Sequence, residues 1–274
     1  MDALQLISEG KLAAALGALQ DSVRKDAANP KHRIFLFQLL TVLGQWNRAL
    51  TQLNVAAELD AAALPMAQTY REAIQCEALR AEIFAGRRAP LIFGEPPPWL
   101  VLLLEALKQE AAGDLKGAAV SRAAGFEAAP ASGGSANGEA FAWMADADAR
   151  LGPVIEAVVN GRYFWIPIMR ISRIVFDPPA DLRDSVWTPV TFTWTNGAST
   201  VGLIPTRYNA TVLSTDEALL MSRRTQWVEQ GPQAGHGIGQ RMLVTDAADY
   251  ALMDLRSIEF DNPLQAPVDG DLDG

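Results

Sequence analysis

A short stretch near the N-terminus occurs twice, and this repeat limits the possible folds more than any other feature. Residues 10–16 read GKLAAAL, and residues 44–50, which lie 34 positions later, read GQWNRAL. In both copies apolar residues follow at positions i, i+4, i+7 and i+11, the spacing of one buried stripe on a helix. A period of 34 residues with a glycine at the turn is typical of tetratricopeptide repeats. The repeat therefore predicts paired α-helices that stack and present a surface to another protein.

The helical pattern extends over residues 1–126, where alanine and leucine are frequent and β-branched residues are sparse. We expect helical pairs at residues 4–25, 34–60, 66–84 and 99–126. The third pair is an eroded copy, because Ala78 stands where the signature glycine is expected, and Gly113 begins a partial fourth copy. Four prolines between residues 87 and 98 predict an extended interruption of the array.

The composition changes after this helical segment. Residues 127–140 are rich in Ala, Gly, Ser and Pro, which predicts a linker. Residues 141–260 gain Val, Thr and Trp in short runs separated by Pro and Gly, and we expect an α+β domain there. Residues 261–274 alternate Asp, Gly and Pro and predict a disordered acidic tail. The predicted fold class is multidomain, with tetratricopeptide-like helical repeats before a mainly β domain.

Within the second domain the sequence predicts short strands and two helices. The strands are expected near residues 163–166, 171–176, 190–194, 201–204 and 240–244, and the helices near residues 151–160 and 216–227. The dipeptide Asn196-Gly197 directly follows one of these strands and is a strong hairpin signal. Short strands at this spacing indicate a small curled sheet or a partly open barrel. The aromatic run at residues 163–165 is interpreted as a core strand, with a peptide-docking surface as the alternative.

Charge and composition exclude several classes of partner. The chain carries a formal net charge of −9, which disfavours nucleic acid and anionic lipid because both attract clustered Lys and Arg. We see no apolar run of about 18 residues that would span a membrane, and no signal-peptide pattern. The single cysteine, Cys76, is interpreted as a buried and inert thiol. These features predict a cytoplasmic protein that binds neither nucleic acid nor membrane.

Histidines offer little catalytic chemistry. His32 and His236 are the two histidines of the chain, too few for a histidine-rich metal site. His236 lies in the glycine-rich stretch 231–239, which is interpreted as a mobile surface loop. Glycine neighbours would hold an imidazole base loosely, so a nucleophile–histidine pair is not expected there.

The most acidic local cluster is formed by Asp146 and Asp148. Two carboxylates at this spacing could hold Mg²⁺ or divide acid and base roles in a hydrolase. Capping of the helix expected at residues 151–160, together with ion pairing to Arg150, is the favoured interpretation. We therefore predict no catalytic, cofactor-binding or metal site.

Five longer strings of the second domain point to a family. They are WMADADARLGP at residues 143–153, GRYFWIP at 161–167, VWTP at 186–189, GLIPTRY at 202–208 and GQRML at 239–243. In this order they resemble the ImpE family, also called TagJ, which comprises accessory proteins of bacterial type VI secretion systems. The resemblance covers nearly the whole chain, since the family also begins with tetratricopeptide-like helices.

The resemblance implies a non-enzymatic adaptor. Such proteins are understood to bind the small subunit of the contractile sheath (TssB) through a helix near that subunit's N-terminus. They are thought to link the sheath to ClpV, the AAA+ ATPase that disassembles it. The family supplies no catalytic residues and no cofactor, and the partner-binding residues stay unassigned. Two alternatives remain open, namely a repeat scaffold for another assembly and a hydrolase that uses Asp146 and Asp148.

Overall fold

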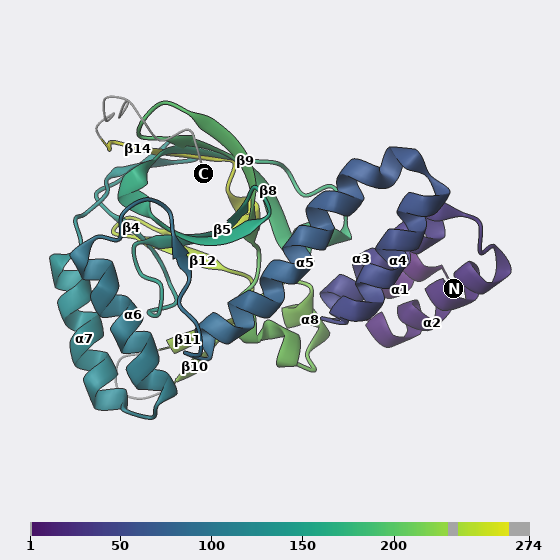
Figure 1. Cartoon of the computed structure of the whole chain (residues 1–274), viewed down its shortest axis with the longest axis horizontal. Helices are drawn as coiled ribbons and strands as arrows, with labels where there is room; N and C mark the ends of the chain where they lie inside the picture. Colours follow the sequence, from purple (N-terminus) through teal and green to yellow (C-terminus); the bar gives the residue numbers. More distant parts are fainter. Residues whose placement is uncertain (1, 230–234, 263–274) are drawn as a thin grey trace.

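The computed structural model describes residues 2–229 and 235–262 and places a helical region beside a mainly β region (Figure 1). The helical region consists of α1 (Ala3–Ser8), α2 (Leu12–Lys25), α3 (Pro30–Val42), α4 (Trp46–Leu59), α5 (Leu64–Phe84), α6 (Pro98–Ala111) and α7 (Leu115–Ala128). This order, helices first and strands second, agrees with the sequence prediction. None of the described helices is long and apolar enough to cross a membrane.

Helices α1, α3, α5 and α6 end in the same way. Each is followed by a glycine with φ between 66° and 85°, at positions 10, 44, 86 and 113. The glycine N–H donates to the carbonyl three residues earlier, and the next N–H donates to the carbonyl five residues earlier. These two hydrogen bonds form the Schellman motif, whose left-handed residue is usually glycine because it has no Cβ. The glycines that mark the repeat in the sequence are therefore helix terminators.

The helical hairpins follow the predicted pairs at first and then depart from them. Helices α1–α2 and α3–α4 occupy the first two predicted units. The third unit is a single 21-residue helix, α5, which continues through Ala78 because no glycine interrupts it before Gly86. The partial fourth copy is a complete hairpin, α6–α7, at the opposite end of α5 from α1–α4 (Figure 1). The helices therefore do not form one continuous array.

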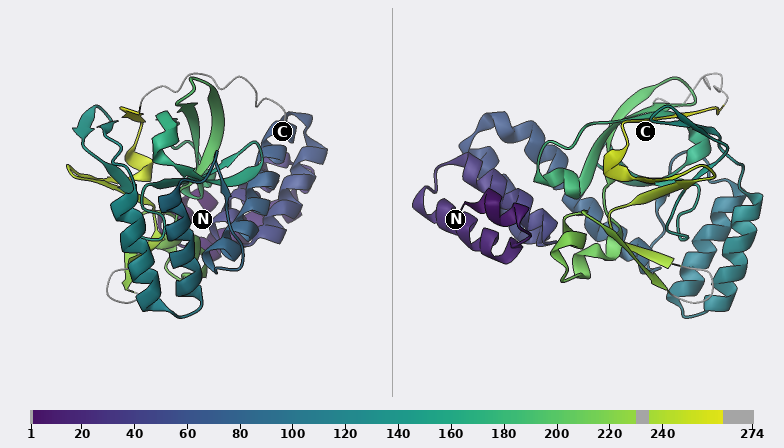
Figure 2. Two further views of the ribbon diagram at one scale, coloured as in Figure 1. Left: turned by 60° about the vertical axis from the view of Figure 1, so that its left-hand side comes forward. Right: turned by 180° about the vertical axis from the view of Figure 1, so that it is seen from behind.

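The β region centres on a strongly curled sheet (Figure 2). Its strands are β1 (Leu91–Ile92), β2 (Gly134–Ala136), β3 (Glu139–Phe141), β5 (Val154–Val159), β6 (Arg162–Pro167), β7 (Ile171–Phe176), β8 (Trp187–Trp194), β9 (Ser199–Pro205) and β14 (Ser257–Phe260). They follow the order β1-β6-β5-β9-β8-β7-β14-β2-β3, and only the β1–β6 pair is parallel. Within the described residues β1 and β3 remain edge strands, so the sheet is open and no barrel is closed.

Two smaller sheets complete the β region. One has the order β13-β12-β4, with β4 (Met144–Asp146), β12 (Met242–Thr245) and β13 (Asp249–Ala251). The other is the hairpin of β10 (Thr225–Glu229) and β11 (Gly235–Gly239), which follows the short helix α8 (Glu217–Leu220). The helix expected over residues 216–227 is therefore confirmed only for the four residues of α8, and its last three residues belong to β10. Residues 235–239 of the expected glycine-rich loop are also a strand, while residues 230–234 lie outside the described chain.

The five strands predicted from the sequence are confirmed as β6, β7, β8, β9 and β12, and Gly197 with φ of 83° closes the β8–β9 hairpin. The helix predicted at residues 151–160 is wrong, because this segment contains β5. Every residue of β5 is buried, since Val154 and Val158 pack toward the helices and Ile155 packs toward the interior of the curled sheet. A strand covered on both faces reads as one apolar run, which its periodicity does not separate from a helix.

The segment predicted as a linker, residues 127–140, belongs to the fold. It contains the end of α7 and the hairpin of β2 and β3, which extends the sheet beyond β14. The predicted acidic tail starts in ordered contact, because the N–H of Asp261 donates to the carbonyl of Gly133 at 2.9 Å. Residues 263–274 lie outside the described chain.

Candidate partner-binding groove beside a buried charge network

The segment 143–150 places its two kinds of side chain on opposite sides. The buried positions are Met144, Asp146, Asp148 and Arg150, and the half-buried or exposed positions are Trp143, Ala145, Ala147 and Ala149. Pairing of β4 with β12 establishes this alternation at the start of the segment. Soluble proteins usually bury apolar side chains and expose charged ones. Here that order is inverted, so the charges need partners inside and a row of apolar side chains is left outside.

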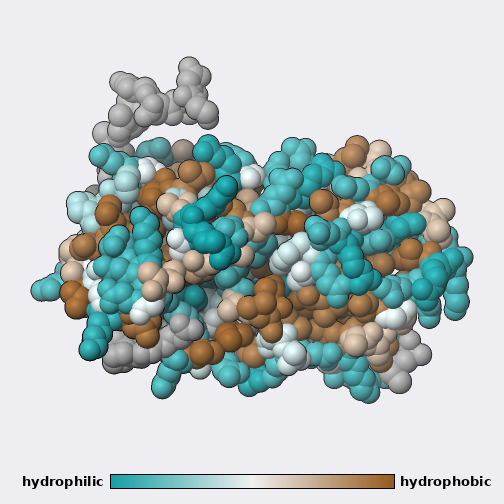
Figure 3. Space-filling model, turned by 60° about the horizontal axis from the view of Figure 1, so that its bottom comes forward, coloured by the Kyte–Doolittle hydropathy of each residue, from teal (hydrophilic) through white to brown (hydrophobic). Residues whose placement is uncertain are grey.

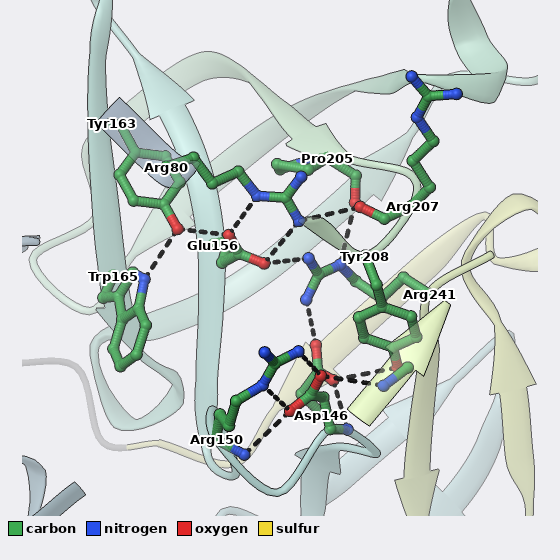
Figure 4. Close-up of polar contacts among 12 residues, drawn as sticks. Arg80, Asp146, Arg150, Glu156, Tyr163, Trp165, Pro205, Arg207, Tyr208 and Arg241 are labelled. Atoms are coloured by element: carbon green, nitrogen blue, oxygen red, sulfur yellow. Dashed lines mark hydrogen bonds and ion pairs between the residues drawn. The ribbon is translucent and has the colours of Figure 1, made fainter. Parts of the chain in front are cut away.

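Asp146 lies at the end of β4 in a fully satisfied site (Figure 4). Its Oδ1 accepts hydrogen bonds from the N–H of Asp148 at 2.8 Å and from the hydroxyl of Tyr208 at 3.2 Å. Its Oδ2 forms an ion pair with Arg241. Burial raises the pKa of Asp146 to about 7, against the opposing effect of Arg241.

Glu156 is the one charged residue of β5, and it faces helix α5. Arg80 of α5 approaches both oxygens, with Nε 2.6 Å from Oε1 and Nη2 3.1 Å from Oε2. Arg241 and the hydroxyl of Tyr163 also contact this carboxylate. Burial alone would raise the pKa of Glu156, but the guanidinium groups of Arg80 and Arg241 outweigh it and lower the pKa to about 2. Arg241 thereby joins Glu156 to Asp146 in one network (Figure 4).

Asp148 is held by its neighbour Arg150; the sequence predicted that Arg150 would pair with one of the two aspartates, and the structure shows that it is Asp148. Nε of Arg150 lies 2.8 Å from Oδ1, and a second guanidinium nitrogen pairs with Oδ2. The N–H of Gly237 on β11 also donates to Oδ2 at 3.1 Å. Burial would raise the pKa of Asp148, but Arg150 overcomes it and lowers the pKa. The predicted capping is made at a turn instead of a helix, because Asp148 accepts from the N–H of Arg150 at 3.0 Å.

These contacts define what Asp146 and Asp148 can do. All four of their carboxylate oxygens are occupied by donors from the protein. Within the described residues, no group of three or more His, Cys, Asp and Glu side chains is placed to hold a metal ion. Removing a guanidinium from a buried carboxylate is costly. The arrangement is therefore suited to fastening α5, β4 and β5 together, and we name Arg80, Asp146, Glu156 and Arg241 the charge lock.

Arg207 fastens the N-terminal hairpins to the same junction. Its guanidinium points away from the charge lock (Figure 4) and donates to the carbonyls of Thr41 at 3.0 Å, Val42 at 2.7 Å and Leu220 at 2.6 Å. The first two carbonyls belong to the last turn of α3, where backbone acceptors are only partly satisfied by the helix. The carbonyl of Thr41 also accepts from the N–H of Gly44 at 3.0 Å. Sequence reasoning missed Arg80, Arg207 and Arg241. For Arg207 and Arg241 a signal was available, because each is the single charged residue in the strings GLIPTRY and GQRML.

His236 is buried on β11, which the expected surface loop did not predict. Its Nε2 lies 2.7 Å from Oε1 of Glu110 on α6, although no hydrogen bond of acceptable geometry joins the two atoms. The glycines serve close packing, since a Cβ at Gly237 would lie 2.2 Å from the ring of Tyr208. His32 lies apart from it, half-buried on α3. Cys76 is buried as predicted, and burial raises the pKa of its thiol to about 12.

The outward row of segment 143–150 forms one wall of an open, mostly apolar groove of about 500 Å³. The opposite wall is Phe126, near the end of α7, and residues 129–132. Trp143 and Phe126 both line this groove, and 40% and 39% of their surface is exposed. Gly152 makes room for Phe126, because a Cβ there would lie 2.3 Å from the ring. We name this hollow the Trp143 groove.

Other apolar surfaces are present. A hollow of about 490 Å³ lies between α1, α3 and residues 179–182, and one of about 410 Å³ lies between α5 and the sheet. On the face shown in Figure 3, hydrophobic residues gather across the middle of the molecule among hydrophilic ones. The Trp143 groove differs from these in combining two exposed aromatic side chains with a row of small apolar ones.

Comparison with known proteins identifies the family. A sequence model of the ImpE protein matches residues 138–259, which include the wall of the Trp143 groove formed by segment 143–150. The type VI secretion system accessory component TagJ of Pseudomonas aeruginosa is 50% identical over 261 residues, which are 95% of this chain and 92% of that protein. A crystal structure of a Vibrio parahaemolyticus protein matches with a TM-score of 0.83 at 25% identity, over 94% of this chain and 97% of that one. The resemblance seen in the five sequence strings is thereby confirmed, and the chain belongs to the ImpE/TagJ family.

Proposed function

We propose that this chain is a cytoplasmic, non-enzymatic adaptor of a type VI secretion system. It binds the small subunit of the contractile sheath, TssB, and assists disassembly of the sheath by ClpV. The observation that carries the proposal is the 50% identity to the accessory component TagJ along 95% of the chain. The five sequence strings, which span the β region, support the same assignment.

The geometry supports a binding role. The Trp143 groove is open and mostly apolar, and two partly exposed aromatic side chains line it, which suits a helix that lays its apolar face into a groove. The hairpins α1–α2 and α3–α4, which share the glycine terminators Gly10 and Gly44, are on this proposal tetratricopeptide-like units. The hydrolase alternative receives no support, because the carboxylates of Asp146 and Asp148 are buried in ion pairs with arginine.

The binding step is tested by co-purification. The full chain carrying an affinity tag is co-expressed with TssB, and in parallel with TssB that lacks its N-terminal helix. We expect the intact subunit to co-purify in a stoichiometric complex and the shortened subunit to be lost. Retention of the shortened subunit would contradict recognition of the helix, and failure of both to bind would contradict the adaptor function.

A further inference from the structure

We propose that the Trp143 groove receives an amphipathic helix of the partner, which has one apolar stripe and basic residues beside it. This inference rests on the proposed adaptor function. It adds the docking residues and the chemistry of the docked segment. The groove is formed by the segment 143–150 and by the end of α7 with the residues that follow it.

The apolar part of the inference follows from the inverted segment. Folding accounts for the buried charges, because Asp146 and Asp148 are paired with arginines. Folding gives no reason to expose Trp143 beside a row of alanines. Contiguous apolar surface on a soluble protein commonly marks a binding site, and tryptophan is enriched among the side chains that dominate binding energy in such sites. Ala145, Ala147 and Ala149 line the same groove as Trp143 and Phe126, and their small side chains leave room for the apolar stripe of a helix.

The basic part follows from the charges at the rim. Asp246 is exposed, and its carboxylate accepts from the N–H of Ala142 at 2.7 Å, beside Trp143. Asp261 is exposed and lies beside Gly133, the residue that follows the lining residues 129–132. Among the described residues that line the groove there is no Lys, Arg or His, and the one acid, Asp146, is neutralised by Arg241. The rim is therefore negative and favours a positively charged partner.

The backbone favours a helix over an added strand. Strand addition needs free N–H and C=O groups along a sheet edge. The N–H of Asp146 on the outer edge of β4 already donates to the carbonyl of Gly152 at 2.7 Å, so this donor is not free to pair with an added strand. The chain's own terminal segment is an unsuitable occupant, because residues 263–274 contain three aspartates and no Lys or Arg. The partner must therefore bind through its side chains and carry the opposite charge.

The test measures the affinity of a fluorescently labelled peptide of the TssB N-terminal helix for the purified full chain. The central variant is Trp143→Ala, and the matched control is Trp227→Ala on β10, whose side chain is 42% exposed compared with 40% for Trp143. We expect Trp143→Ala to weaken binding at least about tenfold and Trp227→Ala to change it less than about twofold. A second variant, Ala147→Gln, puts a larger side chain at a half-buried residue that lines the groove and is expected to weaken binding as well. Thermal unfolding of each variant confirms that it is folded.

The possible results distinguish a wrong docking site from a wrong adaptor function. Unchanged binding by both Trp143→Ala and Ala147→Gln would overturn the groove while leaving the adaptor intact. If the unaltered chain does not bind intact TssB, the adaptor function itself is overturned. Raising the salt from about 0.05 M to about 0.5 M should weaken binding, because exposed charges are screened, and salt-independent affinity would overturn the basic flank. Tighter binding after removal of residues 263–274 would identify the chain's own terminal segment as the occupant and contradict the charge argument.

Discussion

Helix α2 and the segment 143–150 both alternate between two kinds of side chain at regular spacing. The apolar side chains of α2 face the core, whereas most of those in segment 143–150 face outward. In α2 the stripe of Leu12, Ala15 and Leu19 is buried and the other positions mostly face solvent. In segment 143–150 the charged side chains are buried and the alanines face outward. The hydrophobic effect explains α2, whereas the inverted segment depends on ion pairs made with distant elements. A sequence period therefore identifies two faces without saying which one is inside.

The largest effect is expected when the buried ion pairs behind segment 143–150 are broken. Replacing Arg241 by alanine leaves Asp146 and Glu156 without their shared partner in a fully buried site. Loss of one partner from a buried ion pair typically costs about 3–5 kcal/mol. We expect a loss of this size in the free energy of unfolding, measured by urea denaturation.

The matched control is Arg173→Ala, which removes an exposed ion pair with Glu259 at 3.3 Å. Exposed pairs contribute little because water and salt screen them. If Arg241→Ala destabilises the protein no more than Arg173→Ala, the charge lock does not hold the two regions together.

A smaller effect compares the two faces of the segment directly. Met144 is 2% exposed and points into the core, and its replacement by alanine should cost about 2–5 kcal/mol. Trp143 is its neighbour on the outward face, and Trp143→Ala should cost only about 1 kcal/mol despite the larger side chain. Thermal unfolding of both variants measures the difference. Equal destabilisation would show that Trp143 serves the fold and would remove the contrast between the faces.

The smallest effect is expected in the helical region, where the backbone conformation of single glycines determines stability. Gly113 has φ of 85° and open space around it, so Gly113→Ala meets only backbone strain of about 1–2 kcal/mol. Gly17 lies in the middle of α2, also in open space, with no such conformation. Gly17→Ala should therefore stabilise the protein by about 0.5–1 kcal/mol. Chemical denaturation of the two variants should give changes of opposite sign, and the same sign for both would contradict the role of glycine as helix terminator.

Local signals predicted much of the fold. Gly10 and Gly44 marked the first two hairpins, and Asn196-Gly197 marked the β8–β9 hairpin, because each requires a backbone conformation that few residues adopt. The α5 helix was divided wrongly, since a regular period was extended through Ala78 where no terminator exists. Strand β5 was read as a helix because burial on both faces removes the alternation of a strand.

The candidate site was predicted less completely. The pairing of Asp148 with Arg150 is a local contact between residues two positions apart. The sequence predicted that Arg150 would pair with one of the two aspartates but did not distinguish Asp148 from Asp146. The contacts of Glu156 with Arg80 and Arg241 join residues 76 and 85 positions apart. The two walls of the Trp143 groove, likewise, come from α7 and from the segment after β3. No local pattern reports such contacts.

By itself the sequence determined the family, the order of the helical and β regions, and the places where the chain turns. These depend on residue identity at single positions or over short spans. Only the tertiary structure decided which face of segment 143–150 is buried and that Trp143 and Phe126 meet at one groove. The physical reason is that a buried charge is stable only beside its partner, and here the partners come from helix α5, strand β5 and Arg241, which only folding brings together.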